Sequence, residues 1–131
     1  YQMKDRYLFK AKTCTGEWVS GFLHCKENKW YISNKAGIPF AFEVRPDTIC
    51  QCTGLKDKNG NLIWENDIVF VTDDDGCSGQ IDTGVGEIDF LDGLWYISGN
   101  VQNALYDIDK CFQLEVIGNI FDNPELLEMR V

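Results

Sequence analysis

The sequence lacks most of the side chains from which enzymes commonly build an active site. It has a single histidine, His24, so no catalytic histidine can lie anywhere else. Its neighbour Cys25 would point to the opposite side of a strand, which argues against a Cys–His catalytic pair. The chain also contains no Gly-x-Ser-x-Gly nucleophile elbow, no phosphate-binding loop and no dinucleotide-binding glycine pattern. We therefore expect no catalytic residues and no bound cofactor.

Proline is scarce, with three residues among 131, and no apolar run is long enough to cross a bilayer. No basic segment followed by an apolar one opens the chain, as it would in a secretory signal peptide. We therefore expect a soluble, cytoplasmic protein with no membrane partner. In the reducing cytosol its six cysteines are expected to be free thiols. They are Cys14, Cys25, Cys50, Cys52, Cys77 and Cys111.

Basic residues are nearly absent from the second half of the chain. Residues 1–60 contain ten Lys or Arg and six Asp or Glu, a net charge of +4. Residues 61–131 contain two basic and fifteen acidic residues, a net charge of −13, and the two halves sum to −9. Nucleic acid is not expected on the acidic half, because binding phosphates requires Lys and Arg. An acidic surface keeps a protein soluble, and it can also face a basic partner or the basic half of a second copy in a homo-oligomer.

Apolar and polar residues alternate along most of the chain, which is the pattern of half-buried β-strands. In the first such run Tyr7, Phe9 and Ala11 share one face, while Lys10 and Lys12 take the other. Basic residues near aromatic ones are ordinary on an exposed strand face, so we do not expect nucleic acid there either. Further runs predict strands at 18–25, 30–33, 40–44, 62–64, 68–71, 85–90, 94–97 and 111–116. The sequence thus predicts an all-β protein.

Turn-forming residues separate these runs. An Asn-Gly pair within 58–61 is the strongest short hairpin signal, and Asp92-Gly93 is expected to turn a second hairpin. One short helix is expected at the end, with Asn123 as its N-cap and Pro124 at its first position. Residues 72–84 form an acidic, glycine-rich loop, whose length in so small a domain indicates a functional or mobile segment.

Three features come close to a metal or catalytic motif without completing one. The acidic run 73–76 suggests a calcium loop, but with Gly76 at the sixth position the first ligand position falls on Val71. Cys50 and Cys52 would share one face of a strand, but zinc needs a second pair, so buried strand cysteines are expected. Carboxylates are so common in the second half that the sequence singles out no catalytic pair. We therefore expect no specific metal site.

Four segments resemble the YopX family of phage and prophage proteins. They are MKDRYLFKAK at 3–12, TICQCTGLKDKNG at 48–60, IWENDIV at 63–69 and VIGNIFDNPELL at 116–127. Together they span nearly the whole chain, so the resemblance is specific. Where the family usually has glycine between an acidic pair, this chain has Asn66. Both residues tolerate a left-handed backbone, so we expect the turn to survive.

The resemblance implies a single all-β unit over 1–131. Its parts would be an N-terminal β segment (3–52), an SH3-like β-barrel in the second half (53–121) and a short C-terminal helix (122–131). It brings no catalytic, metal-binding or cofactor residues, because no function is assigned to the family. SH3-like barrels commonly present an aromatic and acidic surface to a peptide or protein, and this is an analogy of fold alone.

We therefore expect a non-enzymatic binding or adaptor protein, encoded by a phage or prophage and acting in the cytoplasm of a bacterial host. Its partner would be a basic host or phage protein. Two tryptophans, Trp64 and Trp95, and the acidic loop supply the candidate binding surface, although tryptophans more commonly pack in a core. The candidate residues are Trp64, Trp95, Asp73, Asp74 and Asp75.

Two other hypotheses stay open. The protein could be a polynucleotide mimic that inhibits a host DNA-binding protein, its carboxylates imitating DNA phosphates. That hypothesis predicts a regular row of carboxylates on one exposed face. The protein could instead be a hydrolase that uses carboxylates alone, which requires two or three convergent acids in a cleft.

Overall fold

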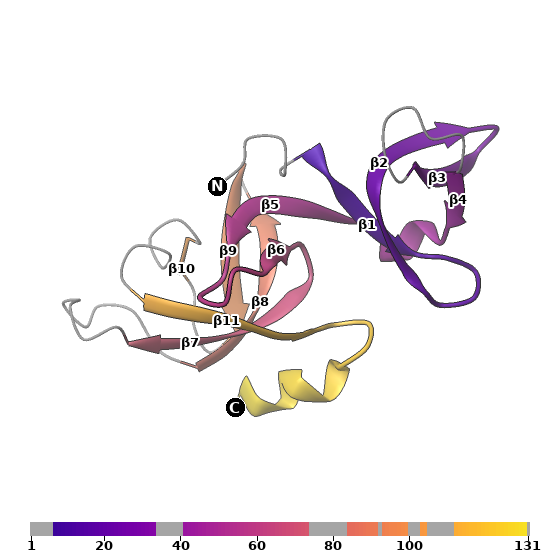
Figure 1. Ribbon diagram of the computed structural model, residues 1–131. Helices are drawn as coiled ribbons and strands as arrows, with labels where there is room; N and C mark the ends of the chain where they lie inside the picture. Colours follow the sequence, from indigo (N-terminus) through magenta and orange to yellow (C-terminus); the bar gives the residue numbers. More distant parts are fainter. Residues whose placement is uncertain are drawn as a thin grey trace. The chain divides into compact units, whose positions relative to one another are not determined.

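The computed structural model describes residues 7–33, 41–73, 84–91, 93–99, 103–104 and 112–130 (Figure 1). In these residues the chain is mostly antiparallel β-strand, which confirms the predicted all-β class. It divides into two compact units, Tyr1–Gly54 (unit 1) and Leu55–Val131 (unit 2). Within the described ranges, no helix is long and apolar enough to cross a membrane.

Unit 1 is a curved antiparallel sheet with the strand order β4-β3-β2-β1, in which β1 also pairs with the start of β5. A bridge between Thr13 and Val44 joins the end of β4 to the end of β1, so the sheet curls (Figure 1). The short 3-10 helix η2 forms where Pro46 pre-sets the backbone at its first position. The elements are β1 (Phe9–Lys12), β2 (Trp18–Lys26), β3 (Lys29–Ser33), β4 (Ala41–Val44), η2 (Pro46–Thr48) and β5 (Cys50–Lys56).

The inner face of this curl holds the core of unit 1. Ala11, Ile32 and Val44 are buried there, and Phe9 packs against them, as the alternation predicts. The prediction for Tyr7 is wrong, because β1 begins only at Phe9 and Tyr7 is exposed in the turn before it. Alternation applies to a residue only while the backbone is extended.

Unit 2 contains a five-stranded antiparallel sheet with the order β10-β9-β8-β7-β11, while β6 neighbours β5. The predicted hairpin at 92–93 is confirmed, because Leu91 pairs with Leu94 across a two-residue turn in which Gly93 has φ 81°. After β11 the chain forms the 3-10 helix η3, which packs against β8. The elements are β6 (Leu62–Trp64), β7 (Asp67–Asp73), β8 (Gly84–Leu91), β9 (Leu94–Gly99), β10 (Asn103–Ala104), β11 (Phe112–Asn119) and η3 (Pro124–Arg130).

One face of the five-stranded sheet carries the core of unit 2. Buried side chains from β7, β8, β9 and β11 meet Ile63 of β6 on this face. They are Val69, Val71, Ile88, Ile97 and Leu114. The strand order among the described strands runs from β10 to β11 without closing, so the structure shows two sheets, and the SH3-like barrel stays a prediction.

Some predicted features lie outside the described residues. The loop expected at 72–84 is shorter than predicted, because Thr72 and Asp73 belong to β7 and Gly84 to β8. The rest of that loop, together with Cys77 and Cys111, is not among the described residues.

Candidate functional site

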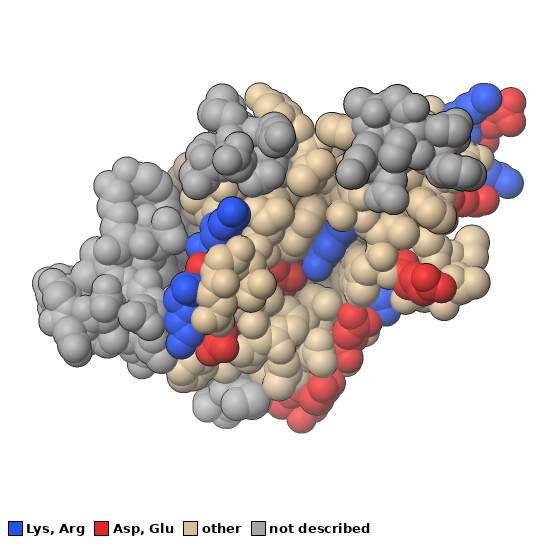
Figure 2. Space-filling view, viewed as in Figure 1, with Lys and Arg blue, Asp and Glu red and all other residues tan. Residues whose placement is uncertain are grey.

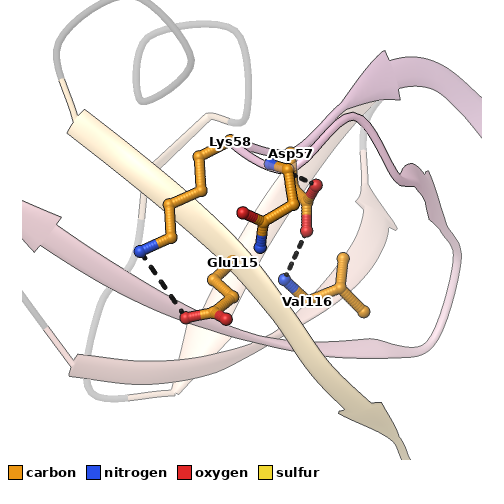
Figure 3. Close-up of polar contacts among 5 residues, drawn as sticks. Asp57, Lys58, Glu115 and Val116 are labelled. Carbon is orange, nitrogen blue, oxygen red and sulfur yellow. Dashed lines mark hydrogen bonds and ion pairs between the residues drawn. The ribbon is translucent and has the colours of Figure 1, made fainter.

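The signature segment 48–60 contains a buried carboxylate, Asp57, which is 7% exposed (Figure 3). Its Oδ1 accepts hydrogen bonds from the backbone N–H groups of Asn59 and Asn61, each at 2.9 Å. Its Oδ2 accepts the N–H of Val116 on β11 at 3.0 Å. Asp57 therefore closes the Asn-Gly loop between β5 and β6 and fastens it to β11.

The pKa of Asp57 follows from this geometry. Burial raises the pKa of the carboxyl, but the hydrogen bonds from Val116, Asn61 and Asn59 outweigh that effect and hold it below the ordinary value of 3.8. Asp57 is thus ionised at neutral pH, with its oxygens bound to backbone amides. This is the chemistry of a structural anchor, whereas a general acid needs a raised pKa.

Two further contacts join the same loop to β11. The N–H of Lys58 donates to the carbonyl of Leu114 at 2.9 Å. The Nζ atom of Lys58 also lies 3.6 Å from a carboxylate oxygen of Glu115 (Figure 3). Both side chains of this ion pair are more than a third exposed, so it contributes little next to the buried Asp57.

A second buried carboxylate, Asp67, anchors the turn between β6 and β7. Its Oδ2 accepts the N–H of Trp64 at 2.8 Å. Between them Asn66 has φ 70°, which confirms the left-handed turn expected at this position. The N–H of Asn66 donates to the carbonyl of Ile88 at 2.9 Å, and its carbonyl accepts the N–H of Ile120 at 3.1 Å. The turn therefore links β8 to the segment after β11.

Replacing Asn66 by alanine is expected to lower the free energy of unfolding by about 1 kcal/mol, because alanine is strained at this φ, which asparagine adopts more readily than other residues with a Cβ. Asn66→Gly is the matched control and should stay within about 0.5 kcal/mol of the original protein. Equilibrium urea unfolding measures both changes. Equal losses in the two variants would show that the asparagine side chain, and not the backbone conformation, matters at this turn.

The closing signature segment contains a β-bulge. The register of β11 against β7 shifts between Val116 and Gly118. A Cβ atom at Gly118 would lie 2.6 Å from Oδ1 of Asn123. That same oxygen accepts the N–H of Asn119 at 3.3 Å, so the Asn123 side chain points back toward the strand. Gly118 thus makes room for the polar turn that leads into η3.

Gly118→Ala is expected to destabilise the protein by about 1–3 kcal/mol, because the added methyl group forces Asn123 away from its hydrogen bond. Thermal or urea unfolding measures this loss. In the background of Asn123→Gly, which removes the crowding atoms, the same change should cost markedly less. Additive losses in the double variant would contradict this account of the close approach.

Large apolar side chains stand exposed around the β8–β9 turn. Phe90 is 50% exposed, and Leu91 and Leu94 are each 52% exposed. Phe90 also meets Trp95 across the hairpin in an edge-on contact, with ring centroids 4.8 Å apart. Large exposed apolar side chains that gather at one turn commonly mark an interaction site in a soluble protein, even though the register places Phe90 and Trp95 on one face of the hairpin and Leu91 and Leu94 on the other. We call Phe90, Leu91, Leu94 and Trp95 the hairpin tip.

A partly open depression lies beside the hairpin tip, lined by Leu91, Tyr96, Ile97 and Ser98. The register places Asp89, Leu91, Leu94 and Tyr96 on one face of the hairpin, because residues paired across antiparallel strands share a face. The half-buried Asp89 adds a carboxylate to this face. The region therefore combines apolar anchors, a depression that can receive a side chain, and negative charge.

The residues predicted for the binding surface lie on different elements. Trp64 is half-buried in β6, and Trp95 is half-buried in β9, where it packs against the unit 2 core. Asp73 ends β7, and Asp74 and Asp75 lie outside the described residues. Of the predicted set, the structure thus places only Trp95 in the hairpin tip.

Sequence reasoning missed Phe90, Leu91 and Leu94. A signal was present, because the consecutive apolar residues Phe90 and Leu91 must point to opposite faces of a strand. If only one face of the sheet packs on the core, either Phe90 or Leu91 must point away from that core.

The described cysteines and acids form no metal centre. Within the described ranges, no group of three or more His, Cys, Asp or Glu side chains is placed to hold a metal ion. Cys50 and Cys52 are buried in β5, which confirms the prediction of buried strand cysteines. Cys14 and Cys25 are exposed free thiols.

Fold and site together define a small all-β protein whose signature residues form turns and whose exposed apolar side chains gather at one hairpin. The chain matches the family described as "YopX protein" over residues 2–128, and it belongs to that family. The match confirms the resemblance seen in the four sequence segments.

One relative with this family name is similar over part of its length. The "SPbeta prophage-derived uncharacterized protein YopX" of Bacillus subtilis (strain 168) is 35% identical to this chain over 74 residues. The aligned part covers 53% of this chain and 52% of the relative. The chain therefore spans about half the length of the curated relative that it matches.

Proposed function

We propose that this YopX-family protein is a non-enzymatic binding or adaptor protein that docks an apolar and basic segment of a partner protein on its hairpin tip. The exposure of Phe90, Leu91 and Leu94 around one two-residue turn carries the proposal. Burying such side chains contributes about 25 cal/mol per Å² of apolar surface. A few large apolar anchors commonly supply most of the affinity of a protein interface.

The distribution of charge supports a basic partner. Unit 1 has eight Lys or Arg and five Asp or Glu, a net charge of +3. Unit 2 has four basic and sixteen acidic residues, a net charge of −12, and the two sum to −9. Figure 2 shows acidic side chains gathered over η3, where Glu125 and Glu128 are exposed. Such a field attracts a basic partner to unit 2 and increases the rate of association.

The packing of the unit 2 core supports the SH3-like barrel that the family resemblance implies. Ile63 of β6 and Leu55 of β5 pack on the core face of the five-stranded sheet. We propose that the residues of 53–121 form the SH3-like barrel that the family resemblance implies, built around this core. The name of the Bacillus relative supports a prophage origin, by analogy. We further propose that the protein acts in the cytoplasm of a bacterial host.

A photo-cross-linking amino acid at position 94 tests the proposed contact. The matched control carries it at position 42, because Phe42 is similarly exposed, at 40%, but belongs to unit 1. After irradiation in bacterial extract at low salt, we expect discrete adducts from position 94 only. Mass spectrometry should map them to a segment that is both basic and apolar. Adducts from both positions, from neither, or to acidic segments would contradict the proposal.

The acidity of unit 2 also motivates the polynucleotide mimic as a second candidate. Asp57 and Asp67 are buried and bind backbone amides, so neither can imitate a phosphate at the surface. The remaining acids would have to supply the row of negative charges. A competition experiment with the cross-linked partner separates the two functions. A mimic displaces DNA from that partner, whereas an adaptor that uses the hairpin tip leaves bound DNA in place.

A second copy of the chain is also a possible basic partner, because unit 1 is basic and unit 2 acidic. Such a contact is head-to-tail, and it would close into a ring or grow. We expect multi-angle light scattering to show assemblies at low salt that dissociate at high salt, since salt screens surface charges. A monomer under both conditions would reject self-association and leave other partners as the basis of the proposal.

A further inference from the structure

The outer face of the unit 1 sheet gathers aromatic and basic side chains. Paired residues in antiparallel strands share a face, and alternate residues along a strand do so as well. By this register, one face carries the core residues around Ala11 and Ile32. The other, which we call the outer face, carries Lys10, Lys12, Trp18, Phe22, His24, Lys26, Lys29, Tyr31 and Glu43.

Contacts between these side chains show how the rings and the ammonium groups are arranged. The Nζ atoms of Lys10 and Lys12 lie 4.8 Å and 5.4 Å from the centroid of the Trp18 ring. Neighbouring outer-face positions along β2 lie about 7 Å apart, so Phe22 and His24 are neighbours, while Ser20 separates Phe22 from Trp18. Ammonium groups and flat rings therefore occupy one continuous strand face.

The rings on this face are accessible to a stacking ligand. Phe22, at the middle of β2, is 45% exposed. The ring of His24 stacks on Tyr31 with centroids 5.6 Å apart and planes inclined by 17°. His24 is itself exposed, so another flat ring can extend this stack.

The charge of the outer face is opposite to that of the protein as a whole. The outer face carries four lysines and one acid, Glu43, which lies opposite Tyr31 in the strand register. Figure 2 shows several basic side chains over unit 1, with acidic ones between them. A ligand that suits this face carries negative charges at intervals and flat rings between them.

Against the expectation from the sequence of this strand alone, we propose that the outer face of unit 1 binds single-stranded nucleic acid with little sequence preference. Bases would stack on Phe22 and on the exposed side of the His24–Tyr31 pair, while Lys10 and Lys12 would neutralise phosphates. Aromatic platforms beside a basic groove are the usual means of binding single strands, because every base has a flat face. A duplex fits poorly, since its bases are already stacked on each other. The site is separate from the hairpin tip, and either proposal can fail without the other.

Fluorescence anisotropy with a labelled oligothymidine of about 12 nucleotides, within the site size of small single-strand binders, tests the proposal. We expect binding at low salt that unlabelled single strands compete away and that duplex DNA of equal length does not. Phe22→Ala and His24→Ala should each weaken binding about tenfold with little change in salt dependence. The double change Lys10→Ala and Lys12→Ala should reduce the slope of log affinity against log salt by about 1.4.

Phe42→Ala is the matched control, because Phe42 is 40% exposed but pairs with Ile32 on the opposite face. It should bind the oligonucleotide like the original protein. Absence of binding at low salt would overturn the proposal. If heparin displaces the labelled oligonucleotide as well as unlabelled single strands do, and Phe22→Ala does not change the affinity, the outer face is a nonspecific anion-binding surface and the proposal is wrong. If the protein binds no oligonucleotide but self-associates, and the double change Lys10→Ala and Lys12→Ala abolishes that association, the outer face contacts a second copy of the chain instead.

Discussion

Asp57→Asn is expected to lower the free energy of unfolding by about 3 kcal/mol, measured by equilibrium urea denaturation. Asparagine keeps one acceptor oxygen for Asn59 and Asn61 but turns an NH₂ group toward the N–H of Val116. The N–H of Val116 then loses its hydrogen bond to a charged group. It instead faces the NH₂ group of the new asparagine, so two hydrogen-bond donors face each other in a buried site. Asp47→Asn, in an exposed turn of unit 1, is the control and should change the free energy by less than about 0.5 kcal/mol.

The same variant should change how stability depends on pH. The pKa of Asp57 is lower in the folded protein than its ordinary value of 3.8, so the unfolded chain takes up the proton first as the pH falls. The stabilisation from Asp57 is therefore fully present above that value and is lost as the pH falls through the folded pKa. We expect the difference in unfolding free energy between the original protein and Asp57→Asn to shrink below pH 3.8. A difference that stays constant down to pH 2 would contradict the anchoring role of the carboxylate.

Phe90→Ser combined with Leu94→Ser is expected to weaken binding of the cross-linked partner about 100-fold or more. Two anchors lost from the centre of an interface commonly cost about 2 kcal/mol each. Because each side chain is half exposed in the free protein, the free energy of unfolding should fall by only about 1 kcal/mol. Isothermal titration calorimetry with the purified partner measures the affinity, and urea unfolding measures the stability.

Phe42→Ser controls for the loss of an exposed aromatic side chain elsewhere. It should leave the partner's affinity unchanged, because Phe42 belongs to unit 1. An equal loss of affinity in Phe42→Ser, or none in the double variant, would show that the partner does not contact the hairpin tip.

Local patterns in the sequence predicted most of the strands. Successive side chains of an extended backbone point to opposite faces, so a short run of alternating apolar and polar residues is enough to predict a strand. This holds for β2, β3, β8 and β9. The left-handed turn at Asn66 was also predictable, because only residues such as glycine and asparagine adopt it at little cost. The prediction failed at Tyr7, where the residue type fits a strand but the backbone has not yet become extended.

Long-range contacts were not predictable in the same way. Asp57 binds the amide of Val116, 59 positions away, and nothing near either residue in the sequence indicates the other. The bulge at Gly118 likewise depends on a side chain in the following turn. Such contacts arise from pairing between distant strands, so the signature segments showed which residues mark the family without showing what they hold together.

The candidate sites depended on which faces of the sheets are covered. Trp64 and Trp95 were chosen by residue type, yet both are half-buried, while Phe90 and Leu94 are the more exposed. The outer face of unit 1 required the pairing register, which places Phe22 of β2 beside the strand that carries Lys10. Burial and register are properties of the assembled sheet, which a single strand's sequence does not contain.

The central claim is that the signature residues hold the fold of unit 2 while the hairpin tip makes the contact with a partner protein. Hydrogen–deuterium exchange of the protein, free and saturated with its cross-linked partner, tests this most directly. We predict that the partner slows exchange of the backbone amides at 90–96 and leaves exchange of the Asn61 and Val116 amides, which donate to Asp57, unchanged. Protection that appears at the loop around Asp57 and not at the hairpin tip would contradict the account.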